Sequence, residues 1–204
     1  MQHLIIVRHA PTDANNNGIF MGHHDAPCSK AGLAAAEALG TSLQLEEDCR
    51  LFTSPLIRSR ATLDSISSRT QKIADLRLIE RALGEWEGRS EASVQREYPN
   101  AFSSDGTLDP LFTPPGGERA DVFVGRVCDF LVDISEPQSH SGVLVVTHNG
   151  VIAVMRSLIE EKSLRECFAE VEPFLTPRNS EYDGRRLRAF LPKILEALHA
   201  GTYK

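Results

Sequence analysis

The chain has 204 residues, a net charge of −6 and 25% charged residues, which are ordinary values for one globular domain. No long run of Lys and Arg is present, so we expect no nucleic-acid partner. The absence of an apolar stretch of about 18 residues, and of a signal-peptide pattern after Met1, predicts a cytoplasmic protein with no membrane partner. The cysteines are widely spaced, which argues against a zinc site and predicts free, mostly buried thiols. They are Cys28, Cys49, Cys128 and Cys167.

The first part of the chain alternates short apolar runs with helical patterns. Residues 3–8 predict a buried strand, and residues 9–28 predict a loop. Ser29 is a typical N-cap for an alanine-rich helix over residues 30–44. The same patterns predict strands over 50–54 and 72–78 and a helix over 56–69.

The middle of the chain has a different composition. Residues 89–117 are rich in Pro, Gly, Ser and Asp and are too long for a simple connection. We interpret them as a lid inserted over the carboxyl ends of the strands, with a helix from Glu118 to about Ile134 leading back. A continuously apolar strand is predicted over 143–148, with a helix behind it over 150–160.

The end of the chain predicts an amphipathic helix, which completes the pattern of elements. Strands that alternate with helices indicate a parallel or mostly parallel sheet covered on both faces. We therefore predict an α/β fold, a three-layer sandwich whose mostly parallel central sheet is flanked by helices.

Cationic and nucleophilic side chains gather at the predicted strand ends. The first strand ends in Arg8 and His9, Arg58 follows the second, and the strand at 143–148 ends in His148. Ligands of open α/β sheets bind beyond the carboxyl ends of the strands, so these side chains should converge on one crevice. Arginine forks fit phosphoryl oxygens, and histidine is a competent nucleophile near neutral pH. The residues alone therefore predict phosphate chemistry.

Five sequence blocks resemble those of the histidine phosphatase superfamily, the phosphoglycerate-mutase-like enzymes. They are "VRHAPTDAN", "TSPLIRSRAT", "LIERALGEWEG", "PPGGE" and "VLVVTHNGVIAVM". The blocks occur in the order of that family and span residues 4 to 155. The resemblance implies a single domain over residues 1–204, with the lid inserted at about 89–117.

The resemblance implies that His9 attacks phosphorus and becomes phosphohistidine. A histidine must be neutral to attack, so one ring nitrogen should be fixed by a backbone acceptor while the other faces phosphorus. Glu80 would protonate the leaving oxygen and then help water to hydrolyse the phosphoenzyme. Glu87 is the other candidate acid, but we expect it to bond loop backbone. His23 and His24 either touch the substrate or lie on the surface.

The resemblance assigns the remaining matched residues to phosphate binding. Arg8, Arg58 and a protonated His148 would hold the phosphoryl oxygens and stabilise the charge of the transition state. Asn15 and the backbone N–H of Asn149 would be secondary contacts. Cationic side chains would do the electrostatic work of a metal, and no cluster of metal-ligand residues is visible. We therefore expect no metal and no other cofactor.

The sequence departs from the family pattern at a few positions. Ala10 replaces the usual glycine after the histidine, where a positive φ would be less comfortable. Ile19 stands where many members carry an arginine that reaches the substrate, and Met21 follows. We expect Ile19 and Met21 to favour a single phosphate on an apolar or neutral body. Arg119 stands where a serine is usual and is the residue that could restore positive charge.

The leading prediction is a phosphatase, a phosphoric monoester hydrolase that acts on a small phosphorylated metabolite. The first alternative is a phosphoglycerate mutase-type phosphoryl transferase, which needs extra basic residues where the lid has only Arg89 and Arg96. The second is a non-catalytic phospho-ligand binding module, which the presence of His9, Glu80 and His148 disfavours. The sequence specifies neither the substrate nor the oligomeric state, and it leaves a homodimer open.

Overall fold

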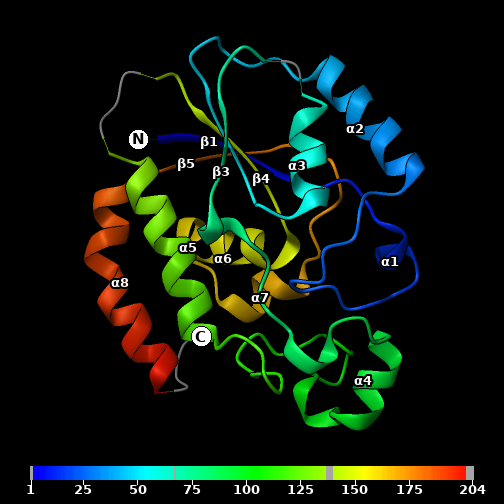
Figure 1. Ribbon diagram of the computed structural model, residues 1–204. Coiled ribbons are helices and arrows are strands. Elements are labelled where there is room, and N and C mark those ends of the chain that lie inside the picture. The colour runs from blue at the N-terminus through cyan, green and yellow to red at the C-terminus, as the bar shows by residue number, and fades with distance from the viewer. Residues whose placement is uncertain (1, 67, 137–139, 201–204) are drawn as a thin grey trace.

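The computed structural model describes residues 2–66, 68–136 and 140–200, and within them five strands form one sheet (Figure 1). The order across the sheet is β3-β2-β4-β1-β5. The strands are β1 (Gln2–Arg8), β2 (Arg50–Thr53), β3 (Lys72–Ala74), β4 (Val143–Thr147) and β5 (Arg178–Tyr182). The first four run parallel, and β5 pairs antiparallel with β1 at one edge.

Helices cover both faces of this sheet, because successive side chains of a strand point to opposite faces. On one face Leu4 and Ile6 of β1 share a core cluster with Leu187. On the other face Val7 packs in a second cluster with Leu63. The first face is covered by α5 (Ala120–Ile134), α6 (Asn149–Glu160) and α8 (Gly184–His199), and the second by α2 (Lys30–Ser42) and α3 (Ile57–Asp64). The predicted three-layer sandwich with a mostly parallel sheet is therefore confirmed.

The remaining helical segments lie near the carboxyl edge of the sheet or in the lid. They are α1 (Asp13–Asn16), α4 (Glu91–Glu97) and α7 (Leu164–Ala169), with the 3₁₀ turns η1 (Leu76–Leu78), η2 (Gly84–Trp86) and η3 (Pro99–Ala101). None of the helices in the described ranges is long and apolar enough to cross a membrane.

Three local predictions needed correction. The strand predicted over 72–78 ends at Ala74, because the Asp75 side chain accepts the N–H of Arg77 and starts η1. The loop predicted over 9–28 contains α1, which Thr12 begins with a capping box. The edge strand β5 was missed, because its sequence RNSEY is mostly polar and only its last residue is buried.

Residues 89–117 and the turn before them form a lobe with a small core of their own, at the lower right of Figure 1 around α4. Trp86 is fully buried at its centre. Its ring stacks on Phe112 and Phe102 at centroid distances of 5.5 and 6.1 Å. Aromatic stacking gives this lid a core although α4 and η3 are its only helical segments among the described residues.

The lid is tied to the sheet layer by two arginines, of which Arg81 is buried and Arg165 is exposed. Arg81 is 3% exposed and donates to the backbone oxygens of Glu118, Pro110 and Phe112. Such a guanidinium satisfies three carbonyls that the irregular chain would otherwise leave unpaired. At the far end, Arg165 of α7 forms a bidentate ion pair with Asp109 of the lid, at 2.9 and 3.2 Å.

Candidate active site

A cleft of about 400 Å³ opens between the carboxyl ends of the central strands and the lid. Its volume falls within the usual range for small-molecule sites. All the predicted site residues except His148 line it: Arg8, His9, Asn15, Ile19, Met21, Arg58, Glu80 and Asn149. His148 lies directly beneath the floor, with its ring centroid 5.0 Å from that of His9.

His9 follows the last residue of β1 and is 3% exposed. Its Nδ1 lies 2.7 Å from the backbone oxygen of Ala10. A carbonyl can only accept, so the proton is on Nδ1 and the lone pair is on Nε2. Burial, reinforced by the nearby charge of Arg58, lowers the pKa of His9 to about 3. The lone pair on Nε2 is therefore available at neutral pH, and Nδ1 is held, as predicted, by a backbone acceptor.

Ala10 fits beside His9 without strain. Its N–H donates to the Thr62 hydroxyl at 2.8 Å. Among the described non-glycine residues a positive φ occurs only at Glu161 and Leu175, so Ala10 needs no glycine-like backbone. The backbone strain that the sequence suggested for alanine at this position is absent.

His148 begins α6 as its N-cap and is 1% exposed. Its Nε2 lies 2.7 Å from the hydroxyl of Ser54, and its buried Nδ1 has no partner among the described residues. Burial, together with repulsion from His9 and Arg58, places the pKa of His148 well below its usual value. The protonated His148 expected from the sequence is therefore not the state of the ligand-free site.

The two arginines, Arg58 buried and Arg8 partly buried, are held by backbone carbonyls. Arg58 is 1% exposed and donates to the oxygens of His24 and Gly22, at 2.9 Å each. Arg8 donates to the oxygen of Glu172 at 2.7 Å. The Nε atom of each arginine is buried with no acceptor in the described part of the chain. Burial lowers the pKa of Arg8 to about 10, so Arg8 remains cationic at neutral pH.

Glu80 points into the cleft from the turn after η1. Its two oxygens accept the N–H groups of Arg81 and Gly150, at 2.9 and 3.1 Å. A Cβ on Gly150 would lie 2.5 Å from the Glu80 carboxylate, so only glycine permits this approach. The backbone oxygen of Glu80 accepts bonds from His23 and Arg126, at 2.8 and 3.1 Å.

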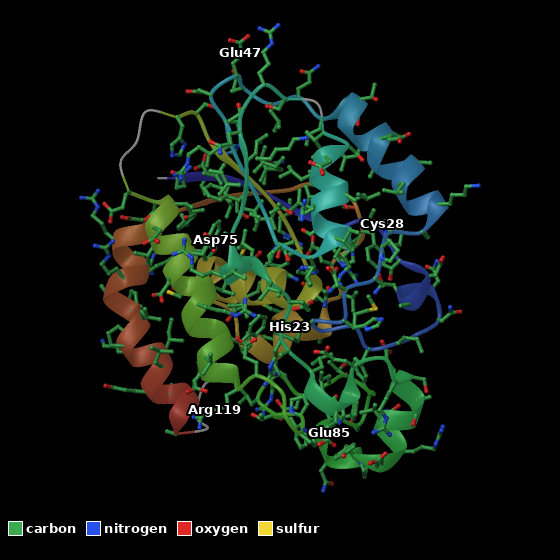
Figure 2. All side chains as sticks on the ribbon, in the orientation of Figure 1. His23, Cys28, Glu47, Asp75, Glu85 and Arg119 are labelled. Carbon is green, nitrogen blue, oxygen red and sulfur yellow. The ribbon has the colours of Figure 1, made fainter. Side chains whose placement is uncertain are left out.

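Glu87 has the structural role that the sequence predicted. One of its oxygens accepts the N–H groups of His23 and Leu83, at 2.9 Å each. Gly22 lies against this carboxylate with φ +48, and a Cβ there would come within 2.3 Å of it. His23 and His24 are both exposed, in line with the surface interpretation, and the His23 ring also bonds the Glu80 backbone oxygen where the lid and the sheet layer meet (Figure 2).

The two asparagines use their side-chain oxygens inside the protein. Asn15 accepts the N–H and the hydroxyl of Thr12, at 3.1 and 2.9 Å. Asn149 accepts the N–H of Glu172 at 2.8 Å. The backbone N–H of Asn149 lies in the first turn of α6, where helix N–H groups favour an anion.

The mouth of the cleft is apolar and acidic rather than basic. Ile19 and Met21 line it together with Phe102, Leu108 and Phe168, and the charged residues that line the cleft beyond Arg8, Arg58 and Glu80 are Arg81, Glu91 and Asp105. The Arg81 guanidinium is fully engaged by backbone oxygens. Arg119, which the sequence suggested as a source of positive charge, and the lid residue Arg89 are paired with carboxylates. Arg89 is paired with Glu97, and Arg119 with Asp121 at the start of α5, outside the cleft lining (Figure 2).

Several supporting residues were not singled out from the sequence. Ser54 and Thr62 lie in one of the recognised blocks and Arg81 in another, so the blocks themselves were the available signal. Glu172 and Phe174 lie beyond all the blocks, and no sequence pattern marked them. The described residues include no group of three or more His, Cys, Asp or Glu that could hold a metal ion.

Comparison with known proteins gives a consistent result. Residues 4–170 match the sequence profile described as histidine phosphatase superfamily (branch 1). The adenosylcobalamin/alpha-ribazole phosphatase of Escherichia coli is 29% identical over 154 residues, covering 74% of this chain and 76% of that protein. Phosphoglycerate mutase-like protein 4 of Arabidopsis thaliana is 31% identical, covering 77% and 69%. The structure of YhfR from Bacillus stearothermophilus is 26% identical, with a TM-score of 0.79 over 90% of this chain and 93% of that one.

Proposed function

The chain belongs to the histidine phosphatase superfamily, and we propose that it hydrolyses a small phosphate monoester through a phosphohistidine at His9. One observation carries this proposal most strongly. The Ala10 carbonyl fixes the tautomer of His9, so a neutral Nε2 is available in a cleft that Arg8 and Arg58 also line. That combination of nucleophile and cationic donors is what transfer of a phosphoryl group requires.

In the first half of the reaction, Nε2 of His9 attacks phosphorus and the bond to the ester oxygen breaks. A proton from the carboxyl of Glu80 passes to the departing oxygen, which leaves as a neutral alcohol. Arg8 and Arg58 bind the phosphoryl oxygens, with the backbone N–H of Asn149 as a further donor. Removing a donor of this kind typically costs about 3 kcal/mol of transition-state stabilisation.

In the second half, the Glu80 carboxylate takes a proton from water as the water oxygen attacks phosphorus. The bond between nitrogen and phosphorus breaks, and its electron pair returns to Nε2 of His9. Inorganic phosphate leaves and Glu80 is protonated again. The two backbone N–H groups that hold the carboxylate keep it facing the same point in both halves.

His148 gains its charge with the substrate rather than before it. In the empty site burial and neighbouring cations keep the imidazole neutral. A phosphoryl group brings negative charge within reach of this ring, and an anion favours the imidazolium form. His148 then supplies a third cationic contact to the phosphoryl oxygens.

We propose that the substrate carries a single phosphate on an apolar or neutral body. Ile19, Met21 and the apolar lid residues offer no partner for a second anion. Burying an unpaired second phosphate there would be costly, and the carboxylates of Glu91 and Asp105 would repel it. The E. coli relative is named a phosphatase, which supports hydrolysis.

The main alternative is phosphoryl transfer between two positions of a phosphoglycerate-like substrate, which the name of the Arabidopsis relative keeps open. A mutase has to grip a carboxylate and a second phosphate with additional basic side chains. Arg81, Arg89 and Arg165 lie in or beside the lid, but all three are bonded to protein oxygens. The charge distribution therefore favours a phosphatase.

An assay with p-nitrophenyl phosphate, with and without bisphosphoglycerate, separates the candidates. We expect phosphate release that bisphosphoglycerate does not stimulate and that dialysis against EDTA leaves unchanged. Dependence on bisphosphoglycerate would support a mutase, and no release from any ester of a metabolite panel would support a binding module. Activity lost with EDTA and restored by Mg²⁺ or Zn²⁺ would contradict the metal-free mechanism.

A further inference from the structure

The segment of residues 171–175 follows the part of the chain that matches the family profile, and its Phe174 packs behind the cleft against Arg8 and His9. The Phe174 ring lies under the guanidinium of Arg8, with the Arg8 carbon Cζ 3.7 Å from the ring centroid. The same ring meets the ring of His9 edge-on at 5.7 Å. One aromatic side chain therefore contacts both the proposed nucleophile and the arginine beside it.

The backbone that carries Phe174 is fixed on both sides. The N–H of Leu175 donates to the backbone oxygen of Arg8 at 3.1 Å, and Leu175 adopts φ 56 to make that turn. Before it, Asn149 accepts the N–H of Glu172 at 2.8 Å. The Glu172 carboxylate is buried and paired with Arg178 at 3.1 Å. The position of the Phe174 ring is thus set by backbone bonds and a buried ion pair.

This contact stabilises the charge of the partly buried Arg8 without occupying its N–H donors. A carboxylate beneath the guanidinium would stabilise its charge, but it would also consume N–H donors and neutralise that charge. The face of an aromatic ring attracts a cation and accepts no strong hydrogen bond. One Nη of Arg8 donates to the backbone oxygen of Glu172, and Nε of Arg8 has no acceptor among the described residues. The ring therefore holds the cation in place while leaving donors for a ligand.

We propose that Phe174 is a positioning residue of the phosphoryl site, whose ring fixes the Arg8 guanidinium beside His9 and keeps its N–H donors free for phosphoryl oxygens. The inference rests on the proposed function, because it assigns Arg8 to the phosphoryl group. Phe174 acts through Arg8 and forms no bond to the substrate itself.

The first test compares Phe174→Leu with the conservative variant Phe174→Tyr. A desolvated cation–π contact corresponds to a factor of roughly thirty in an equilibrium constant. We expect Phe174→Leu to lower kcat/KM for p-nitrophenyl phosphate about thirtyfold and to weaken binding of inorganic phosphate, measured by calorimetry. Phe174→Tyr should remain within about threefold of wild type, since its ring keeps the cation–π face.

A matched control is Phe190→Leu on α8, where Arg186 lies 5.8 Å from another phenylalanine ring outside the cleft. This variant makes the same side-chain change and should leave kcat/KM and phosphate binding unchanged. If Phe174→Leu fails to fold, Phe174→Met removes the aromatic face with less loss of volume and should show the same thirtyfold effect.

A double-mutant cycle with Arg8→Gln, which removes the cation, identifies the route of the effect. If Phe174 works through the Arg8 guanidinium, Phe174→Leu should cost less than about threefold in the Arg8→Gln background. An equal thirtyfold loss in both backgrounds would overturn the proposal. So would wild-type kcat/KM and phosphate affinity in Phe174→Leu. A wild-type protein that binds phosphate but releases none from esters would instead refute the proposed function, and the calorimetric comparison would still test Phe174.

Discussion

The floor of the cleft, at the strand ends, and its mouth, lined by Ile19 and lid residues, differ in burial and in charge. On the floor, His9 and Arg58, with His148 directly beneath them, are each at most 3% exposed, and each is tied to the protein by a hydrogen bond within 3 Å. At the mouth, Ile19 and Phe102 are partly exposed and Asp105 is exposed, on loops with little regular structure. The cations of this floor are Arg8 and Arg58, and it fits only the phosphoryl group that we propose as its ligand. Selection among phosphorylated compounds therefore falls to the mouth.

The largest effect should come from the floor itself. Replacing His9 with Ala removes the nucleophile, and catalytic groups that act as a unit lose about 10⁴-fold or more in kcat when one is removed. The measurement is phosphate release from p-nitrophenyl phosphate, with circular dichroism as a check of folding. If His9→Ala keeps wild-type turnover, His9 is not the nucleophile and the proposed mechanism is wrong.

The next effect separates two carboxylates that are close in sequence. Glu80→Gln should lower kcat for alkyl phosphates by about 10²–10³-fold, because a general acid contributes that much. The loss should be smaller for p-nitrophenyl phosphate, whose phenolate leaves with little help. The experiment is a comparison of kcat for the two ester classes.

Glu87→Gln is the matched control, because it makes the same chemical change where the carboxylate bonds only loop N–H groups. Weakening these charged bonds should cost about 2 kcal/mol, which lowers Tm by several degrees. Its kcat should be close to wild type. The reverse assignment, with Glu87 as the acid, predicts the opposite pattern for the two variants.

The burial of His9 and His148 also predicts that the stability of the protein depends on pH. The pKa values of His9 and His148 are lowered in the folded protein, to about 3 for His9, while both groups titrate near 6.5 when unfolded. Below pH 6.5 the unfolded chain therefore binds protons that the folded one does not, and stability falls as pH falls. The two histidines together should cost about 2–3 kcal/mol between pH 7 and pH 5.5.

Urea unfolding at the two pH values measures this loss. His148→Gln should remove about half of it, and His24→Gln, a change at an exposed side chain, should leave it intact. A drop of the same size in His148→Gln would mean that His148 is not held neutral in the empty site.

The smallest effect is expected at the mouth. Ile19→Arg places a charged donor where the structure has an apolar wall, and one such bond is worth about tenfold in kcat/KM. The ratio of kcat/KM for a bisphosphate to that for an apolar monoester should rise accordingly. Leu76→Arg adds the same charge at an exposed position outside the cleft lining and is the control. An unchanged ranking of substrates in Ile19→Arg would show that position 19 does not select them.

The difference between the floor and the mouth of the cleft also explains which features could be predicted from the sequence. The floor residues lie at strand ends inside short sequence blocks, so apolar periodicity and block order were enough to bring Arg8, His9, Arg58 and Glu80 to one cleft. The strand β5 was not predictable, because an edge strand needs no apolar alternation. Phe174 was not predictable either, since its contact with Arg8 depends on how a chain segment far along the sequence returns to the end of β1.

The protonation state of His148 was another point that residue identity could not decide. The sequence around a histidine at a strand end does not show whether its side chain is solvated or buried. The structure shows that His148 is buried beside His9 and Arg58, and this position lowers its pKa and keeps it neutral before the substrate binds. The acidic side chains of the mouth were missed for a related reason. Glu91 and Asp105 face the cleft only because the lid folds around Trp86.

The most direct test of the account is to trap the phosphoenzyme. The protein is mixed with substrate, quenched within milliseconds without acid, and digested for mass spectrometry of the peptide that contains His9. The account predicts phosphate on His9, appearing and decaying as fast as turnover, and longer-lived in Glu80→Gln because water then lacks its base. Full turnover with no phosphorylated intermediate, or phosphate on any residue other than His9, would contradict it.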